Sequence, residues 1–293
     1  MIYLVSFTDS RMWRSFKRIA KQAEKFRIFD GLFLFDEKDL NNDFKHHFKD
    51  HLFFGSRGYG YWSWKPEIIL YALKKINDGD SLLYIDAGCH LNHKGKQRLI
   101  DYFKMLEEAD KGIIAFQSNT PDTVNSNIIY DGRKLFSQPN YKWIKGDLLD
   151  HFNARDKKEY TNSEAIGAGI LIIKKCKAAI AIIEEWQSII WNDFHFLDDT
   201  PSSSSNLPGF IEHRHDQAIW SLLCLKHNIK TLSAYEYWYP KNNSNKLEPD
   251  WDALNFHPIH ARRDKDMGIL TKIRNKINKS SKYILANLWH RYG

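Results

Sequence analysis

The stretch WKPEIILYALKKINDGDSLLYIDAG, residues 64–88, decides the fold. It predicts a helix over residues 66–76, because Pro66 is tolerated in a first turn and apolar residues recur behind it. The segment Asn77-Asp-Gly-Asp breaks this helix, and the apolar run at residues 81–85 is typical of a buried strand. The strand ends at Asp86, so an acid stands at its carboxyl end.

The same alternation of strands and helices continues on both sides of this stretch. The pattern predicts strands at residues 2–7, 31–35, 81–85, 112–116, 166–174 and 230–233, and helices at residues 11–26, 36–50, 66–76, 94–109, 144–152, 177–191 and 215–226. Such alternation favours an α/β fold with a mainly parallel central sheet covered on both faces. We expect residues 1–262 to form this domain. The serine-rich residues 198–209 are expected to be a mobile loop, too polar to pack.

The composition excludes several classes of protein. With 293 residues, 43% of them hydrophobic and 27% charged, the chain can bury a large core and is not typical of a disordered segment. It has no apolar run near the ~20 residues that cross a bilayer, and residues 1–14 lack the pattern of a secretory signal. Three cysteines without metal-type spacing indicate neither a disulfide scaffold nor a zinc ribbon. We therefore expect a cytoplasmic protein.

The excess of positive charge is confined to the end of the sequence. The chain has 43 Lys and Arg against 36 Asp and Glu, and the whole difference arises from residue 262 onward. A nucleic-acid-binding protein would carry its basic residues on a folded face, so we expect no nucleic-acid partner. In the tail, residues 263–293, isoleucines recur at helical spacing. It is either an amphipathic helix on an anionic membrane, at its inner cytoplasmic face, or a last helix packed on the domain.

Asp86 is the first candidate for chemistry. Open α/β sheets bind ligands at the carboxyl ends of their strands, and a carboxylate there can hold Mg²⁺ or Mn²⁺ against a diphosphate. Gly88 would let a ligand approach the backbone, and His90 is a possible further ligand. The alternative is that Asp86 only caps a turn.

A second candidate is the segment GYGYWSWKP, residues 58–66, with the aromatic Trp62 and Trp64 before Lys65. Aromatic faces stack on sugars and nucleobases, and a lysine can meet a phosphate as a point charge. The alternative is a loop that its tryptophans anchor in the core. Ser6, Thr8 and Arg11, which follow the first strand, are weaker candidates for nucleotide contacts.

A third candidate is IEHRHDQ, residues 211–217, at the start of an apolar helix. Asp216 could be a general base or orient an acceptor hydroxyl, or it could cap the helix. His215 and Gln217 are candidates for the acceptor side.

The last candidate is FHPIHARRDK, residues 256–265. It offers His257 or His260 as a metal ligand, and arginines and a lysine for phosphate oxygens, or else a solvated basic linker.

Taken in order, these pieces resemble glycosyltransferases of the GT-A fold. The resemblance covers most of residues 1–262, and its strongest part is residues 64–88, which is similar to the helix, turn and strand that lead to the family's Asp-x-Asp motif. The run IGAGILIIKK, residues 166–175, is similar to a later strand that faces the donor sugar, and HRHDQ lies where many members have Asp-Gln. The whole set looks like bacterial enzymes that build capsule or lipopolysaccharide chains.

The resemblance implies a role for each matching residue. Asp86 would bind a Mn²⁺ or Mg²⁺ ion and the nucleotide, with His260 as a further metal ligand, and Asp216 would serve the acceptor. Contacts to the nucleotide-sugar donor would come from Ser6, Thr8, Arg11, Trp62, Trp64, Lys65, Gly88, Gly167, Arg262, Arg263 and Lys265. The acceptor would be a glycan or a lipid-linked glycan. The sequence departs from the motif at Gly88, which replaces the second acid and leaves one carboxylate for a metal.

Two other functions remain open. A metal-dependent phosphohydrolase is suggested by His215 and Asp216 with His195 and His213 near them in sequence, although that class is all-helical. A non-catalytic sugar-binding or membrane-adaptor protein would use only the aromatic residues and the basic tail.

Overall fold

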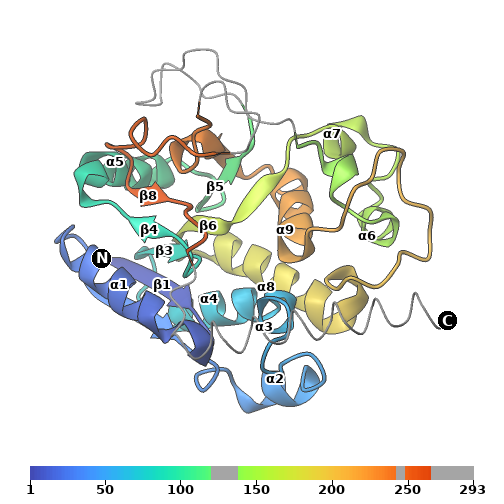
Figure 1. Ribbon diagram of the computed structural model, residues 1–293, viewed down its shortest axis with the longest axis horizontal. Helices are drawn as coiled ribbons and strands as arrows, with labels where there is room; N and C mark the ends of the chain where they lie inside the picture. The colour runs from blue at the N-terminus through green and yellow to red at the C-terminus, as the bar shows by residue number, and fades with distance from the viewer. Residues whose placement is uncertain (120–137, 242–247, 265–293) are drawn as a thin grey trace, which may run out of the picture.

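In the computed structural model, which describes residues 1–119, 138–241 and 248–264, the alternating strands form one six-stranded sheet with the order β2-β1-β3-β6-β5-β7 (Figure 1). The strands are β1 (Ile2–Phe7), β2 (Gly31–Phe35), β3 (Ser81–Ile85), β5 (Ile113–Gln117), β6 (Ile166–Lys174) and β7 (Lys230–Ser233). Five share one direction, and β6 runs against its neighbours β3 and β5. The expected α/β fold with a mainly parallel sheet is confirmed.

The helices follow the expected order with some changes of length. They are α1 (Trp13–Glu24), α2 (Asn42–His47), α3 (Gly58–Tyr61), α4 (Trp64–Lys74), α5 (Lys96–Glu107), α6 (Gly146–His151), α7 (Lys158–Thr161), α8 (Lys177–Asn192) and α9 (His215–Lys226). The helix expected over residues 36–50 is only α2. It starts late because the Asn41 side chain caps the N–H of Phe44, while Asp36 and Asp39 close a separate turn before it.

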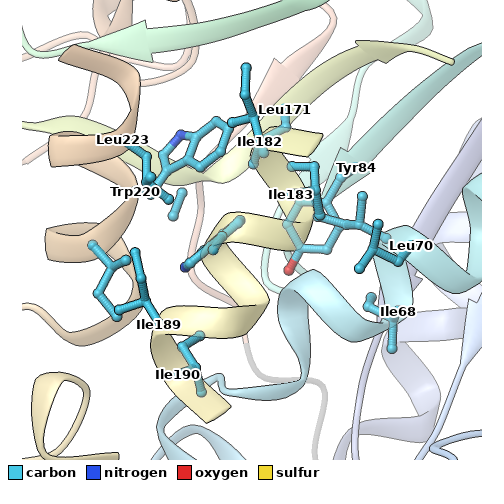
Figure 2. Close-up of a cluster of buried hydrophobic side chains, with 14 of the residues drawn as sticks. Ile68, Leu70, Tyr84, Leu171, Ile182, Ile183, Ile189, Ile190, Trp220 and Leu223 are labelled. Carbon is cyan, nitrogen blue, oxygen red and sulfur yellow. The ribbon is translucent and has the colours of Figure 1, made fainter. Parts of the chain in front are cut away.

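Two apolar cores lie on the two faces of the sheet. Alternate residues of β3 point to opposite sides, so that Leu82 and Tyr84 belong to one core, and Leu83 and Ile85 belong to the other. Helices α4, α8 and α9 cover the first face, and α1 and α5 cover the second. Figure 2 shows side chains of α4, α8 and α9 in this first core, together with Tyr84 of β3 and Leu171 of β6. Each large apolar side chain buried in this way stabilises the fold by about 1.5–3 kcal/mol.

The serine-rich segment at residues 198–209 has no buried residue, but hydrogen bonds hold it to α6; the mobility expected for it stays a prediction. Asp147, in the first turn of α6, accepts hydrogen bonds from the backbone N–H groups of Ser203 and Ser204, at 2.7 and 2.8 Å. The carboxamide of Asn206 in turn accepts from the N–H of Gly146. A polar loop can be held in place when its backbone groups find hydrogen-bond partners of this kind.

The end of the described chain returns to the sheet. A two-stranded sheet pairs β4 (His90–Leu91) with β8 (Ile259–His260), and it sets residues 262–264 against the turn that follows β3. The tail from Lys265 to Gly293 lies outside the described residues, and so does the amphipathic helix expected there. Among the helices that the structure describes, none has the length and hydrophobicity to cross a bilayer.

Candidate functional site

Asp86 lies at the carboxyl end of β3, near the middle of the sheet. Its backbone N–H donates to the carbonyl of Gly169, which continues the pairing of β3 with β6 by one residue. Its Oδ1 accepts a hydrogen bond of 2.6 Å from the hydroxyl of Tyr84, a residue of the same strand. The Asp86 side chain is 38% exposed, so the carboxylate is fixed at one oxygen and still open to solvent.

Lys65 joins Asp86 to Asp216 beneath this surface. It lies in the first turn of α4 and is buried, with its ammonium 3.3 Å from Oδ1 of Asp86 and in contact with Oδ2 of Asp216. The Nζ also donates to the carbonyl of Ala168, at 2.9 Å. An ammonium has three protons, and these three acceptors match that number. Lys65 is therefore enclosed by protein acceptors, whereas the sequence suggested a point charge for a phosphate.

The charges of Asp86, Lys65 and Asp216 depend on one another. Burial alone would lower the pKa of Lys65, but the carboxylates of Asp216 and Asp86 outweigh it and raise that pKa. Burial raises the pKa of Asp216 to about 6, although Lys65 acts against this rise and Asp86 adds to it. Asp216 is thus not an isolated base on the acceptor side but the inner member of a charged trio.

Glycines make room for the side chains at this edge of the sheet. A Cβ at Gly169 would lie 2.9 Å from Oδ2 of Asp86, and a Cβ at Gly167 would lie 2.8 Å from the hydroxyl of Tyr237. A Cβ at Gly88 would come within 3.2 Å of the backbone of Arg263. These approaches explain why glycines stand at these three positions, and they show that residues far apart in sequence meet here.

Positive charge reaches the site from the last described segment. The N–H of Asp264 donates to the carbonyl of Gly88, and Arg263 adopts a left-handed backbone conformation with φ of 53° beside it. Burial raises the pKa of Tyr237, and the positive charge of Arg263 acts against this rise. Arg262 lies against the ring of Trp251, at 5.0 Å. The structure therefore brings Arg263 close to Gly88 and Tyr237, as a charge available to a bound anion.

The donor set around Asp86 does not fit a divalent ion held by protein side chains alone. Oδ1 of Asp86 already faces the Lys65 ammonium, and within the described residues no three His, Cys, Asp or Glu side chains gather as a metal cluster. Nε2 of His260 contacts the carbonyl of Leu254, and its ring stacks on Trp251. His90 faces Asp264 and Gln22. The assignment of Mn²⁺ or Mg²⁺ to Asp86 and His260 stays a prediction.

The residues expected after the first strand serve mainly local structure. The hydroxyl of Ser6 donates to the carbonyl of Ile85, and that of Thr8 to the carbonyl of Asp9. Arg11 pairs with the carboxylate of Asp9. The Ser6 contact ties β1 to the end of β3, next to Asp86.

The two tryptophans before Lys65 differ in placement. Trp64 is buried against Phe7, with ring centroids 4.0 Å apart, and donates from its indole N–H to the carbonyl of Gly58. Trp62 is half-buried and has a left-handed backbone with φ of 63°. Only Trp62 of this pair has surface to offer a ligand.

The histidines near α9 face different partners. His195 contacts Asp147, His213 contacts the carbonyl of Phe196, and His215 contacts the carbonyl of Leu197. They do not point at one centre, as a phosphohydrolase would need, and Gln217 is half-buried on the first turn of α9.

Tyr84, Gly169 and Tyr237 belong to the site, and the sequence pattern assigned no role to any of them, although Tyr84 opens the motif Y-x-DAG at residues 84–88. Tyr84 reads as one residue of an apolar run, and only its position two before Asp86 places its hydroxyl near that carboxylate. Gly169 follows Gly167 by two residues in a strand that, apart from Lys174 at its end, otherwise consists of large apolar residues and alanine, which was a usable signal.

No protein-family profile and no curated protein matches the chain. Among solved structures, similar ones include a glycosyltransferase involved in glycosylation of the major capsid of PBCV-1, with 13% identity, coverage of 88% of this chain and 91% of the other, and a TM-score of 0.42. Mouse xyloside xylosyltransferase 1 gives 8% identity, 89% and 97% coverage and a TM-score of 0.44. The galactosyltransferase LgtC has 12% identity, with coverage of 88% of this chain and 86% of the other and a TM-score of 0.38. Values this low establish neither a family nor a reaction for the chain.

Proposed function

We propose that the chain is a glycosyltransferase that moves a sugar from a nucleotide-diphosphate donor to a glycan or lipid-linked glycan. The observation that carries this proposal is the partly exposed carboxylate of Asp86 at the carboxyl edge of the sheet, with the backbone of Arg263 packed against Gly88, two residues further along the chain. In a sheet of this kind that edge is where ligands bind. The juxtaposition of one acid and one cation suits a ligand that has both hydroxyl groups and an anionic diphosphate.

The chemistry asks for charge stabilisation and positioning more than for a strong acid. The bond between the anomeric carbon and the diphosphate oxygen breaks, and the diphosphate leaves with the electron pair. The acceptor oxygen bonds to the anomeric carbon, and its proton passes to an oxygen of the departing diphosphate. Arg263 and Arg262 are proposed to stabilise the departing diphosphate, and Asp86 to bind hydroxyls of the donor.

Asp216 has a supporting role in this proposal. It is buried and reaches the site through Lys65, so we assign it the control of the charge on Asp86 and not direct contact with the acceptor. We further propose that the reaction belongs to the assembly of a bacterial surface polysaccharide at the inner face of the cytoplasmic membrane. Its support is the resemblance of residues 64–88 and 211–217 to that group of enzymes.

Thermal-shift titration tests the proposal. Nucleoside diphosphates with different bases are added to the full chain, with and without Mn²⁺, and one of them is expected to raise the melting temperature by mass action. With the matching nucleotide sugar, Asp86→Ala is expected to reduce turnover about 100-fold or more. The control is Asp78→Asn, which changes an exposed acid paired with Lys175. If no nucleoside diphosphate stabilises the protein, or Asp86→Ala keeps wild-type turnover, the proposal is wrong.

A further inference from the structure

A second polar and aromatic cluster lies next to the charged trio. It consists of five residues, Arg57, Tyr61, Trp62, Asp199 and His215. Trp62 precedes Lys65 by three residues, and His215 directly precedes Asp216. Short pieces of backbone therefore hold this cluster beside the site of the proposed reaction. In Figure 1, α3 lies next to the segment that follows α8, and the contact between Arg57 and Asp199 joins them.

The cluster has an exposed ion pair at its outer side. One guanidinium nitrogen of Arg57 donates to both oxygens of Asp199, at 3.0 and 3.1 Å, and the two side chains are 47% and 48% exposed. The hydroxyl of Tyr61 also donates to Asp199, and burial together with this contact raises the pKa of Tyr61. Planar carboxylate and guanidinium groups with open edges are suited to pairs of neighbouring hydroxyls.

The inner side of the cluster has an acceptor without a donor. Nδ1 of His215 is 2.7 Å from the carbonyl of Leu197, so Nδ1 must carry the ring proton. In the neutral ring Nε2 is then an acceptor, and burial lowers the pKa of His215 and favours that form. The His215 side chain is 4% exposed, its Nε2 has no hydrogen-bond partner, and Oδ1 of Asp199 is 3.7 Å away. Two acceptors face each other, and neither can donate to the other.

The backbone holds these groups in an unusual conformation. Tyr61, Trp62 and His215 all have left-handed φ values, of 55°, 63° and 50°. Such a conformation is costly for large side chains and is kept when the surroundings require it. Its result here is that the rings of Tyr61 and Trp62 lie 5.1 and 5.7 Å from the ring of His215.

We infer that this cluster is a binding subsite for a pyranose ring of a neutral saccharide and, resting on the proposed function, that it receives the acceptor. A ligand hydroxyl would donate to Nε2 of His215, and further hydroxyls would pair with Asp199 and Arg57. The apolar face of the sugar would pack on Trp62 and Tyr61. A phosphate fits worse, because the carboxylate of Asp199 repels it and Arg57 is already paired.

The test uses saturation-transfer NMR on the full chain, with methyl glycosides of glucose, galactose and mannose and with lactose as probes. Wild-type protein is expected to transfer saturation to at least one probe. Asp199→Asn and His215→Asn are each expected to lower the affinity for that probe about tenfold, which is the effect of losing one hydrogen bond to a charged or buried group. Asparagine tolerates the left-handed backbone of residue 215, which keeps the second variant folded. Asp78→Asn is the control.

Two outcomes overturn the inference. One is that no probe binds the wild type, or that both variants bind it as the control does. The other is that Asp199→Asn abolishes stabilisation by the nucleoside diphosphate, since the cluster would then belong to the donor. The proposed function can fail while this inference holds. If the wild type binds a saccharide and both variants lose that binding, but no nucleoside diphosphate stabilises the wild type, the subsite is supported and the chain is a saccharide-binding protein.

Discussion

Asp216 is buried, yet it controls the charge of a carboxylate that is not. When Asp216 is protonated, the Lys65 ammonium has only Asp86 as an anionic partner and neutralises it. When Asp216 loses its proton, Lys65 is shared between two carboxylates, and Asp86 regains negative charge toward the ligand. The negative charge that Asp86 presents to a ligand is therefore expected to change where Asp216 titrates.

The first prediction concerns pH. Because the pKa of Asp216 is raised to about 6, we expect kcat/KM to rise with pH through about 6 and to level off above it. In Asp216→Asn this rise should disappear and the activity should be low at every pH. The profile is measured between about pH 5 and pH 8. A wild-type profile that is flat through 6 would contradict the role given to Asp216.

The same pKa has a consequence for stability. Between the ordinary pKa of 3.8 and about 6 the folded state keeps a proton that the unfolded chain has released. The free energy of unfolding that depends on Asp216 therefore decreases as pH rises through this window. A carboxylate with a lowered pKa would have the opposite effect, because its contribution to the free energy of unfolding increases as pH rises.

Gly169 tests how closely Asp86 must be placed. A Cβ there would lie 2.9 Å from Oδ2 of Asp86, which is the end of a side chain that can move. We expect Gly169→Ala to displace the carboxylate and reduce kcat about tenfold or more, with little change in melting temperature. Gly95→Ala is the contrasting variant. Its Cβ would come within 2.3 Å of the backbone of His257, so it should destabilise the fold. If Gly169→Ala keeps full kcat, the position of Asp86 is not critical.

At the level of elements, the sequence predicted the strands and helices that have a strong local hydrophobic pattern. The strands at residues 31–35, 81–85 and 166–174 and the helix at 215–226 were placed at their observed ends, because apolar runs and breakers coincide there. Hydrophobic pattern does not encode strand direction, so the reversal of β6 was not predicted. The contact of Lys65 with Asp216 joins residues 151 positions apart, and only the packing of α4 and α9 on one face creates it.

For residues 198–209 the composition of the segment itself was an incomplete guide. Their composition is that of a flexible linker, but Asp147 of α6 organises them from outside the segment. Local composition cannot reveal a partner that lies some fifty residues away.

The third prediction concerns this loop. Asp147→Asn removes the charge that two backbone N–H groups share, so we expect the amides of Ser203 and Ser204 to exchange about tenfold faster with solvent. Hydrogen exchange followed residue by residue is the measurement, with exchange in α9 unchanged. Glu184→Gln, an exposed acid on α8, is the control. Unchanged exchange at Ser203 and Ser204 would mean that other contacts hold the loop.

For the whole molecule, the central question is whether the two cores can unfold separately. They share one sheet, and neighbouring residues of β1, β3 and β5 enter different cores, so such a strand that leaves one core also leaves the other. The buried tryptophans Trp64, Trp186 and Trp220 all lie in the first core. The second core is flanked by Arg98 of α5, which makes two buried hydrogen bonds of 2.7 Å to Glu236. These features allow one core to be perturbed while the other is observed.

The fourth prediction changes a residue beside the second core and observes the tryptophans of the first. Glu236→Gln leaves the buried guanidinium of Arg98 without its anion and should destabilise the chain by about 3–5 kcal/mol. We expect the urea midpoint by tryptophan fluorescence to fall together with the midpoint by far-ultraviolet circular dichroism, although the buried tryptophans Trp64, Trp186 and Trp220 lie on the other face. Lys104→Gln, which breaks an exposed pair with Asp101 on the same helix, should change stability by less than about 1 kcal/mol. A fluorescence midpoint that stays at its wild-type value in Glu236→Gln, while the dichroism midpoint falls, would show that the two faces unfold independently and that the shared sheet does not couple them.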